Sequence, residues 1–316
     1  MPDPASTARR GTLGAVARPS GAFAMVALDQ RESLRTMLAQ AEDANHRSVP
    51  DDALVEFKVE AARALTRHAS AVLLDVDYGL GPVRAADAIA RGCGLIVAAD
   101  RLMQRPSGPV ERTQVDEAVL SDAALWAIAD AFKLLVIWRP DRERAVRDEV
   151  VRTFLDGCRA ASRPAIVEGI VRLEGADPTA DEHADLVAAA AGELGSLGPD
   201  LYKAEVPTLG SAADADIARA AERVTAALRC PWVVLSNGTS PERFADATVA
   251  ACRGGASGFL AGRALWSRSL AAPDRAADLR EVAAPRLREL AERVDSAARP
   301  WWDATTIAAR GNVTRT

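Results

Sequence analysis

The stretch Asp200-Leu201-Tyr202-Lys203-Ala204-Glu205-Val206-Pro207 places a lysine inside a short apolar run. The run predicts a buried strand, which ends at Pro207 because proline cannot continue the hydrogen-bond ladder. A buried ammonium group costs free energy unless it is paired or used. Burial and nearby cations lower a lysine's pKa, and a neutral amine can attack a carbonyl to form a Schiff base. Lys203 is therefore a candidate nucleophile. The alternative, a surface ion pair with Glu205, needs a wet strand face, since residues two apart share a face.

The same pattern recurs along the chain from Gly21 onward. A short apolar run ends in a polar residue, and a helical stretch rich in alanine, arginine and glutamate follows, in about eight units. Apolar runs without alternation are typical of parallel strands that are buried on both faces. The chain is therefore predicted to be an α/β protein, a (β/α)8 TIM barrel with a parallel eight-stranded core. No Gly-x-Gly-x-x-Gly follows the first strand, which counts against a Rossmann dinucleotide site.

The predicted barrel does not fill the whole chain. We expect a flexible N-terminal arm over residues 1–20, the barrel over 21–299, and a C-terminal tail over 300–316 that begins by packing on the body. Residues 101–118 contain two prolines and a glycine and are expected to form a long irregular loop over one face of the barrel.

Composition excludes several classes of function. The net charge is −5 with acids and bases well mixed, which argues against nucleic acid as a partner because phosphate binding needs a basic face. No apolar run approaches the roughly 20 residues of a membrane span, so no membrane partner is expected. Residues 1–20 lack the apolar core of a signal peptide, and the expected location is the cytoplasm.

The metal-binding residue types are sparse and scattered. In a chain without a secretory signal, separated cysteines are expected to be reduced and mostly buried. The cysteines are Cys93, Cys158, Cys230 and Cys252. The histidines are not at metal-ligand spacing and are interpreted as surface or helix-end residues. They are His46, His68 and His183. We therefore expect no metal and no organic cofactor.

Polar residues collect where the predicted strands end, and the active site of this fold lies at that end of the barrel. The candidates are Asp29, Asp75, Asp100, Glu168, Ser236 and Arg263, with Lys133 and Lys203 inside strands. An acid at a strand end can also cap the next helix, and we interpret Asp100 in that way. Glu168 precedes Gly169 inside an apolar segment, where there is no helix to cap, so we expect it to be functional.

Two further features support a site for an anionic carbonyl compound. A second inward lysine, Lys133, would disfavour the ammonium form of Lys203 by repulsion, although a lysine that opens a strand is often merely solvated. Ser236-Asn237-Gly238 and Gly262-Arg263 place glycines where strands meet helices, so that backbone N–H groups and a guanidinium can approach an anion. A phosphate site after strands seven and eight is expected in preference to plain turns.

Five segments together resemble the Schiff-base aldolases of the tagatose-1,6-bisphosphate aldolase and sulfofructosephosphate aldolase group. The resemblance runs from about Gly21 to the helix near residue 298. It implies a class I aldolase, a metal-independent aldehyde-lyase in the form of a homo-oligomer, a dimer or tetramer, that acts on a phosphorylated sugar. The segments are Ala27-Leu28-Asp29-Gln30-Arg31-Glu32, Leu73-Leu74-Asp75, Phe132-Lys133-Leu134-Leu135, Leu201–Pro207 and Gly262-Arg263-Ala264-Leu265-Trp266.

The resemblance also implies catalytic roles by position. Lys203 forms the Schiff base, and Lys133 lies beside it and keeps its amine neutral. Glu168 moves protons while the carbinolamine forms and dehydrates. Asp29 and Gln30 hold and polarise the substrate hydroxyls.

Binding roles follow in the same way, and they include Asp75 at the end of the second strand. Ser236, Gly238, Gly262 and Arg263 grip the 1-phosphate, and Arg172 meets an anion at the far end of the sugar.

Two substrates are compatible with these motifs. Ile170-Val171-Arg172 resembles the enzymes that cleave 6-deoxy-6-sulfofructose 1-phosphate to dihydroxyacetone phosphate and sulfolactaldehyde, and we favour this reaction. Asp77-Tyr78-Gly79-Leu80 is closer to the tagatose-1,6-bisphosphate aldolases, which give glyceraldehyde 3-phosphate. Arg101, Arg105 and Arg112 depart from both patterns and leave a different aldehyde open.

Two other classes of function fit the same barrel. A sugar-phosphate isomerase or epimerase would use an acid/base pair and no reactive lysine. A non-catalytic sugar-phosphate binding protein would bind ligand without turnover.

Overall fold

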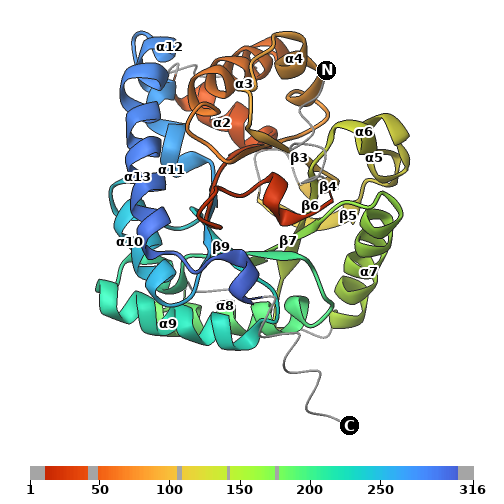
Figure 1. The fold of residues 1–316 in the computed structure, drawn as a ribbon, viewed down its shortest axis with the longest axis vertical. Helices are drawn as coiled ribbons and strands as arrows, with labels where there is room; N and C mark the ends of the chain where they lie inside the picture. Colours follow the sequence, from red (N-terminus) through yellow and green to blue (C-terminus); the bar gives the residue numbers. More distant parts are fainter. Residues whose placement is uncertain (1–10, 42–48, 105–108, 141–142, 175–177, 305–316) are drawn as a thin grey trace.

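Eight parallel strands close into a barrel, as the repeated apolar runs predict (Figure 1). The computed structural model describes residues 11–41, 49–104, 109–140, 143–174 and 178–304. Going round the barrel, the strands follow one another in chain order, with one hairpin outside the closed sheet. The barrel strands are β1 (Phe23–Leu28), β2 (Ala71–Leu74), β3 (Gly94–Ala98), β6 (Ala131–Trp138), β7 (Ala165–Val171), β8 (Leu201–Glu205), β9 (Trp232–Leu235) and β10 (Gly258–Ala261).

The barrel strands are apolar on both faces because each face meets a different core. In β1, Phe23 and Met25 pack inside the barrel, whereas Ala24 and Val26 pack against the surrounding helices. Every residue of β1 is buried. Successive side chains alternate between the two faces of a strand, so a run without polar residues is required.

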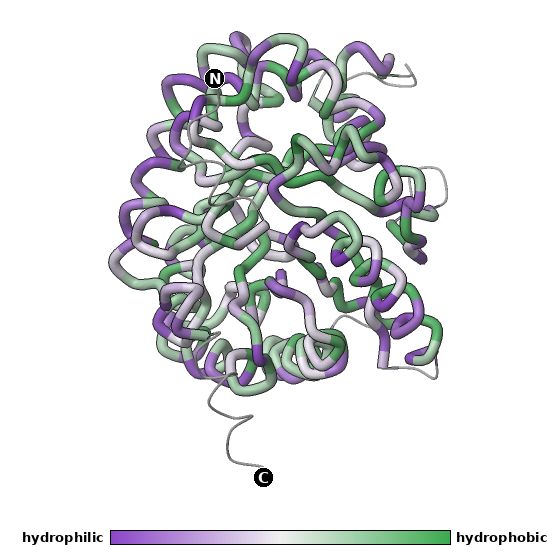
Figure 2. The backbone as a smooth tube through the Cα atoms, turned by 45° about the vertical axis from the view of Figure 1, so that its right-hand side comes forward, coloured by the Kyte–Doolittle hydropathy of each residue, from purple (hydrophilic) through white to green (hydrophobic). Residues whose placement is uncertain are grey.

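Helices cover the outside of the barrel, and hydrophilic and hydrophobic residues alternate along them (Figure 2). In α7, buried residues recur at helical spacing, from Val151 through Phe154 and Leu155 to Cys158. The helices are α2 (Glu32–Ala41), α3 (Asp51–Leu65), α4 (Leu80–Ala85), α5 (Glu117–Ser121), α6 (Ala123–Ile128), α7 (Arg144–Ala160), α8 (Ala180–Gly195), α9 (Asp214–Ala227), α10 (Pro241–Arg253), α11 (Arg263–Trp266), α12 (Arg275–Asp278) and α13 (Ala284–Ala297). The described residues also contain the short irregular helices η1 (Leu13–Ala15), η2 (Pro207–Gly210), η3 (Ser267–Ala271) and η4 (Leu279–Ala283).

Residues near the start and the end of the described chain close the barrel at the end where its strands begin. Leu13 and Val16 are buried in the same apolar cluster as the interior side chains of the strands, and Trp301 packs against that cluster. The Arg18 guanidinium lies 2.7 Å from the Asp295 carboxylate. Residues 11–20 are therefore a plug, and the prediction of a flexible arm was wrong there; residues 1–10 lie outside the described residues. The start of the C-terminal tail packs on the body, as predicted.

The segment 101–118 is more ordered than the irregular loop that was predicted. β4 (Asp100–Gln104) and β5 (Val110–Val115) pair in an antiparallel hairpin, and α5 begins at Glu117. Burial alternates along both strands. This period of two marks a ribbon with one covered face, and the prolines and glycine fall at its turn, where they do not interrupt the pairing.

The cysteines were predicted to be mostly buried, and this holds for two of them, whereas Cys93 and Cys230 are partly exposed. All four cysteines are unpaired, and Cys158 and Cys252 are buried. Burial raises the pKa of Cys230 and of Cys252 to about 12, so these thiols stay protonated at neutral pH. Within the described ranges, no helix combines the length and apolar character needed to cross a membrane.

Candidate active site

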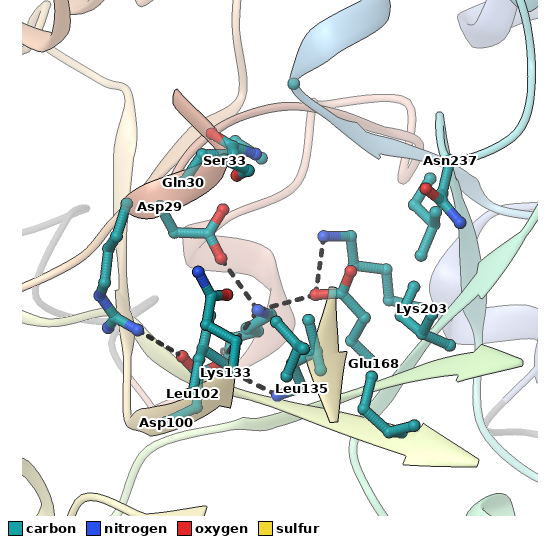
Figure 3. Close-up of a pocket in the computed structure, with 18 of the residues that line it drawn as sticks. Asp29, Gln30, Ser33, Asp100, Leu102, Lys133, Leu135, Glu168, Lys203 and Asn237 are labelled. Atoms are coloured by element: carbon teal, nitrogen blue, oxygen red, sulfur yellow. Dashed lines mark hydrogen bonds and ion pairs between the residues drawn. The ribbon is translucent and has the colours of Figure 1, made fainter. Parts of the chain in front are cut away.

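A cavity of about 650 Å³ opens where the barrel strands end, and it gathers most of the predicted site residues (Figure 3). The hairpin β4–β5 contributes side chains to its wall. The predicted residues that line the cavity are Asp29, Gln30, Lys133, Glu168, Arg172, Lys203, Ser236, Gly262 and Arg263. Residues from six strands or strand ends therefore converge on one space, which is the arrangement expected of a barrel active site.

Lys133 lies at the centre of three carboxylates. Its Nζ is 2.9 Å from Asp29 Oδ2, 3.1 Å from Asp100 Oδ2 and 2.8 Å from Glu168 Oε2. The lysine is only 1 % exposed. A buried cation that is surrounded by three anions remains charged, because the Coulombic gain exceeds the cost of desolvation.

The pKa shifts agree with this charge assignment. Burial alone would lower the pKa of Lys133, but the charges of Asp100, Asp29 and Glu168 raise it well above its ordinary value. Burial would raise the pKa of Asp29 and Glu168, yet the charge of Lys133, followed by that of the second lysine, lowers both. At neutral pH Lys133 is therefore an ammonium ion among carboxylates and cannot act as the free amine.

Lys203 has a simpler environment. Its Nζ lies 2.9 Å from Glu168 Oε2, the same oxygen that contacts Lys133. Lys203 is 3 % exposed and points into the cavity from β8. Figure 3 shows Glu168 between the two lysines. One carboxylate oxygen thus bridges a permanently charged ammonium and the only other amine that lines the cavity among the described residues.

Asp100 has a different role from the helix cap that was predicted. It begins β4 and is 2 % exposed. Besides Lys133, it accepts hydrogen bonds from the backbone N–H of Leu135 at 3.0 Å and from Arg31 Nη1 at 3.3 Å. No helix starts there because the chain continues into the hairpin. Asp100 is thus a site residue that the sequence interpretation missed.

Asp75 lies outside the cavity lining, unlike the predicted substrate contact. Its side chain is fully buried, forms an ion pair with Lys58 and accepts a hydrogen bond from the Tyr78 N–H at 2.7 Å. Lys58 also donates to Leu28 O at 2.9 Å, next to Asp29. The position of Asp75 therefore supports a structural role, in which it fixes the end of β1.

The lysine count is a signal that could have identified Lys58. The 39 lysine and arginine residues include only three lysines, Lys58, Lys133 and Lys203. All three are buried near the ends of the barrel strands. In a chain that uses arginine for its surface cations, each remaining lysine deserves a specific explanation.

The predicted anion-binding corner lies between the ends of β9 and β10. Ser236 and Arg263 line the cavity there. A Cβ on Gly262 would come within 2.7 Å of Ala27 O and of Gln30 Nε2, so only glycine allows this approach to β1. Gly238 does not line the cavity; its φ of 76° serves the turn instead. Gln30 Oε1 accepts no hydrogen bond from any described residue, which leaves it available to a substrate hydroxyl.

The cations of the cavity wall differ in their partners. Arg31 pairs with Asp77 at 2.8 Å, and Arg101 pairs with Asp116 at 3.1 Å. In the part of the chain that the structure describes, Arg172 and Arg263 have no carboxylate partner. Desolvation first, and then the charge of Arg172, lower the pKa of Arg263, whereas nearby carboxylates raise it. The two guanidinium groups without a carboxylate partner follow β7 and β10, which β8 and β9 separate in the barrel.

Apolar side chains also line the cavity. Buried Ile137, Ile170 and Leu235 form a small cluster with Val110 and Leu135, and all five line the cavity. Val110 belongs to the hairpin, so the hairpin completes this cluster.

Of the histidines that the structure describes, neither His68 nor His183 lines the cavity. His183 is 3 % exposed and lies in the first turn of α8, which fits the helix-end alternative of the prediction rather than the surface one. Its Nε2 lies 3.8 Å from Glu205 Oε2. His68 follows the end of α3, as expected, and His46 lies outside the described residues. No group of three or more His, Cys, Asp or Glu side chains in the described ranges is arranged to hold a metal ion.

Comparison with known proteins gives a consistent family assignment. A family model described as DeoC/LacD family aldolase matches residues 23–268. A tagatose 1,6-diphosphate aldolase of Listeria monocytogenes is 28 % identical over 92 % of this chain and 92 % of its own length. Tagatose 1,6-diphosphate aldolase 2 of Streptococcus pyogenes is 27 % identical over 89 % of this chain and 93 % of its own.

Solved structures show the same fold. Fructose-bisphosphate aldolase of Plasmodium falciparum aligns over 94 % of this chain and 97 % of its own, with a TM-score of 0.69 and 14 % identity. An archaeal fructose-1,6-bisphosphate aldolase, whose catalytic lysine is bound to a carbinolamine intermediate, aligns over 90 % and 98 %, with a TM-score of 0.56 and 16 % identity.

Proposed function

The chain belongs to the DeoC/LacD family of aldolases, and we propose that it cleaves a ketose 1-phosphate through a Schiff base on Lys203. The enzyme is thus a lyase. The observation that carries the proposal is the difference in carboxylate partners between the two cavity lysines, three for Lys133 and one for Lys203. Lys133 is committed to three carboxylates, so the amine available for attack is that of Lys203.

The chemistry follows from these positions. The Lys203 amine adds to the C2 ketone, and Glu168 transfers protons while the carbinolamine loses water to give an iminium ion. The iminium accepts the electron pair of the C3–C4 bond as that bond breaks, which gives an enamine and an aldehyde. A carboxylate of the cavity takes the C4 hydroxyl proton, with Asp29 and Gln30 holding the hydroxyls. Protonation at C3 and hydrolysis then release dihydroxyacetone phosphate and restore the amine.

Borohydride reduction in the presence of dihydroxyacetone phosphate tests this directly. The expected result is a covalent adduct on Lys203, detected by intact mass and peptide mapping. Only three lysines exist, so the mapping has few alternatives. An adduct on Lys133 would keep the chemistry and reverse the roles of the two lysines. Bound ligand without an adduct, together with proton exchange, would favour a sugar-phosphate isomerase.

The proposal extends to the anionic group that the substrate carries at the end opposite its 1-phosphate. We favour 6-deoxy-6-sulfofructose 1-phosphate over tagatose 1,6-bisphosphate, and Arg172 would meet the sulfonate or 6-phosphate. The names of the Listeria and Streptococcus relatives, both tagatose 1,6-diphosphate aldolases, favour tagatose 1,6-bisphosphate instead. Comparing sulfolactaldehyde with glyceraldehyde 3-phosphate in the condensation direction distinguishes the two. Assembly as a dimer or tetramer and a cytoplasmic location stay predictions from the sequence.

Replacing Arg263 with alanine should raise KM for phosphorylated substrates by about tenfold to hundredfold, because a charge-assisted contact to the phosphate is lost. The side chain is open to the cavity, so the free energy of unfolding should change little. Steady-state kinetics and urea unfolding give both numbers. An unchanged KM would place the phosphate elsewhere.

EDTA should leave activity unchanged. The three carboxylates that could attract a cation already surround the Lys133 ammonium, and the iminium serves as the electron sink. Activity before and after dialysis against EDTA is the measurement. A loss that added metal restores would contradict the Schiff-base mechanism.

A further inference from the structure

A buried carboxylate reaches Arg263 through one amide. Glu205 Oε1 accepts a hydrogen bond from Asn237 Nδ2 at 2.6 Å, and Asn237 Oδ1 accepts one from Arg263 Nη2 at 2.6 Å. Glu205 ends β8, two residues after Lys203, and is 2 % exposed. Asn237 follows β9 and lines the cavity, as Figure 3 shows.

The chemistry of the two ends determines the orientation of the amide. A carboxylate can only accept hydrogen bonds and a guanidinium can only donate them. Asn237 must therefore turn its NH₂ group towards Glu205 and its oxygen towards Arg263. A flipped amide would place donor against donor at Arg263 and acceptor against acceptor at Glu205.

Glu205 and the loop that carries Asn237 are each held by a further hydrogen bond. Glu205 Oε2 accepts a hydrogen bond from the Val171 N–H at 2.8 Å. Thr239, in the same loop as Asn237, donates to Leu209 O at 3.2 Å. Leu209 follows the strand of Lys203, and its φ of 55° is in the left-handed region that a leucine rarely adopts, so the surrounding packing must hold it there.

We propose that Glu205 and Asn237 are positioning residues that aim Arg263 at the substrate phosphate without neutralising it. Arg31 and Arg101, which also line the cavity, pair directly with carboxylates. These carboxylates partly neutralise the positive charge of the two guanidinium groups. At Arg263 the amide separates the guanidinium from Glu205, so the side chain is oriented while its charge stays available to an anion. The inference rests on the proposed function, because it assumes that Arg263 binds the phosphate.

The test compares a phosphorylated donor with an unphosphorylated one. The concentration dependence of borohydride trapping is measured with dihydroxyacetone phosphate and with dihydroxyacetone. Asn237→Leu keeps the branched shape of the side chain, although leucine is larger, and removes both hydrogen bonds. Half-saturation for dihydroxyacetone phosphate should rise by about tenfold to hundredfold, the size expected for a misplaced charged hydrogen bond, while that for dihydroxyacetone stays the same.

A second variant, Glu205→Gln, tests the same inference if Asn237→Leu does not fold. In Glu205→Gln, one oxygen cannot serve both the Val171 N–H and the Asn237 amide. If the new amide oxygen stays with Val171, its NH₂ forces Asn237 to flip and present a donor to Arg263. The same selective loss for dihydroxyacetone phosphate is expected. Thr239→Val is the matched control, because it removes a hydrogen bond of the same loop and leaves the hydrogen bonds from Glu205 to Arg263 intact. The ratio of the half-saturation concentrations for dihydroxyacetone phosphate and dihydroxyacetone should be the same in this variant as in the wild type.

Arg263→Ala separates failure of this inference from failure of the proposed function. If Arg263→Ala does not selectively raise the half-saturation concentration for dihydroxyacetone phosphate, the phosphate binds elsewhere and the inference is wrong as well. If Arg263→Ala shows the loss but Asn237→Leu and Glu205→Gln do not, the positioning role is refuted while the aldolase assignment stands. Adding Asn237→Leu to Arg263→Ala should cause no further loss, since both act through one guanidinium.

Discussion

Lys203→Ala should lower kcat by about 10⁴-fold or more, because the variant has no amine with which to form the iminium. Lys133 cannot substitute for it, since Asp29, Asp100 and Glu168 hold its ammonium in place. The first measurement is turnover of a ketose 1-phosphate that is cleaved to dihydroxyacetone phosphate. The second is borohydride trapping, in which the covalent adduct should disappear.

Lys203→Arg is the matched control for charge. Arginine keeps a cation next to Glu168, whose Oε2 lies 2.9 Å from the Lys203 amine, yet it forms no Schiff base. It should therefore be as inactive as the alanine variant while the far-ultraviolet circular dichroism stays native. Activity near wild type in either variant would remove Lys203 as the nucleophile.

Lys133→Met should destabilise the protein by about 3–5 kcal/mol at pH 7, the usual cost of leaving buried charges without their partner. Up to three carboxylates would then face one another in a site that is almost closed to water. Activity should fall as well, because Glu168 loses one of the two cations that position it. Urea unfolding between about pH 4 and pH 7 measures the effect on stability.

The sign of the pH dependence identifies the cause. In the wild type the pKa values of Asp29 and Glu168 are lowered, so these groups contribute stability above their unfolded pKa that is lost as pH falls. Without Lys133, desolvation dominates and raises those pKa values. The folded variant then binds protons more readily than the unfolded chain, and part of its lost stability should return as pH falls towards about 4.

Lys58→Met provides the comparison for Lys133→Met. It leaves one buried carboxylate, that of Asp75, instead of three. The change of unfolding free energy with pH scales with the number of protons taken up. The plot of unfolding free energy against pH should therefore have a smaller slope for Lys58→Met than for Lys133→Met. Equal slopes for Lys133→Met and the wild type would mean that Lys133 does not hold the carboxylates in their charged form.

Local sequence patterns were sufficient for the barrel. Most barrel strands must be apolar on both faces, and this requirement is visible in β1 and β9 without any knowledge of their neighbours. The hairpin β4–β5 was missed because its alternation of exposed and covered residues is short and its turn contains prolines. The plug at residues 11–20 was missed because Leu13 and Val16 are covered only by strands far along the chain.

The nucleophile and its carboxylate could be identified by themselves, since Lys203 and Glu168 are polar residues inside apolar strands, where they need a reason to be buried. Asp75 and Asp100 both follow apolar runs, and nothing local separates them. Only the tertiary structure decided that Asp100 turns to Lys133 and Asp75 to Lys58. It also decided that Asn237 joins Glu205 to Arg263. Sequence pattern determines which side chains must be buried, because burial depends on the strand itself. Which charge meets which depends on how the closing barrel brings strands from distant parts of the chain together.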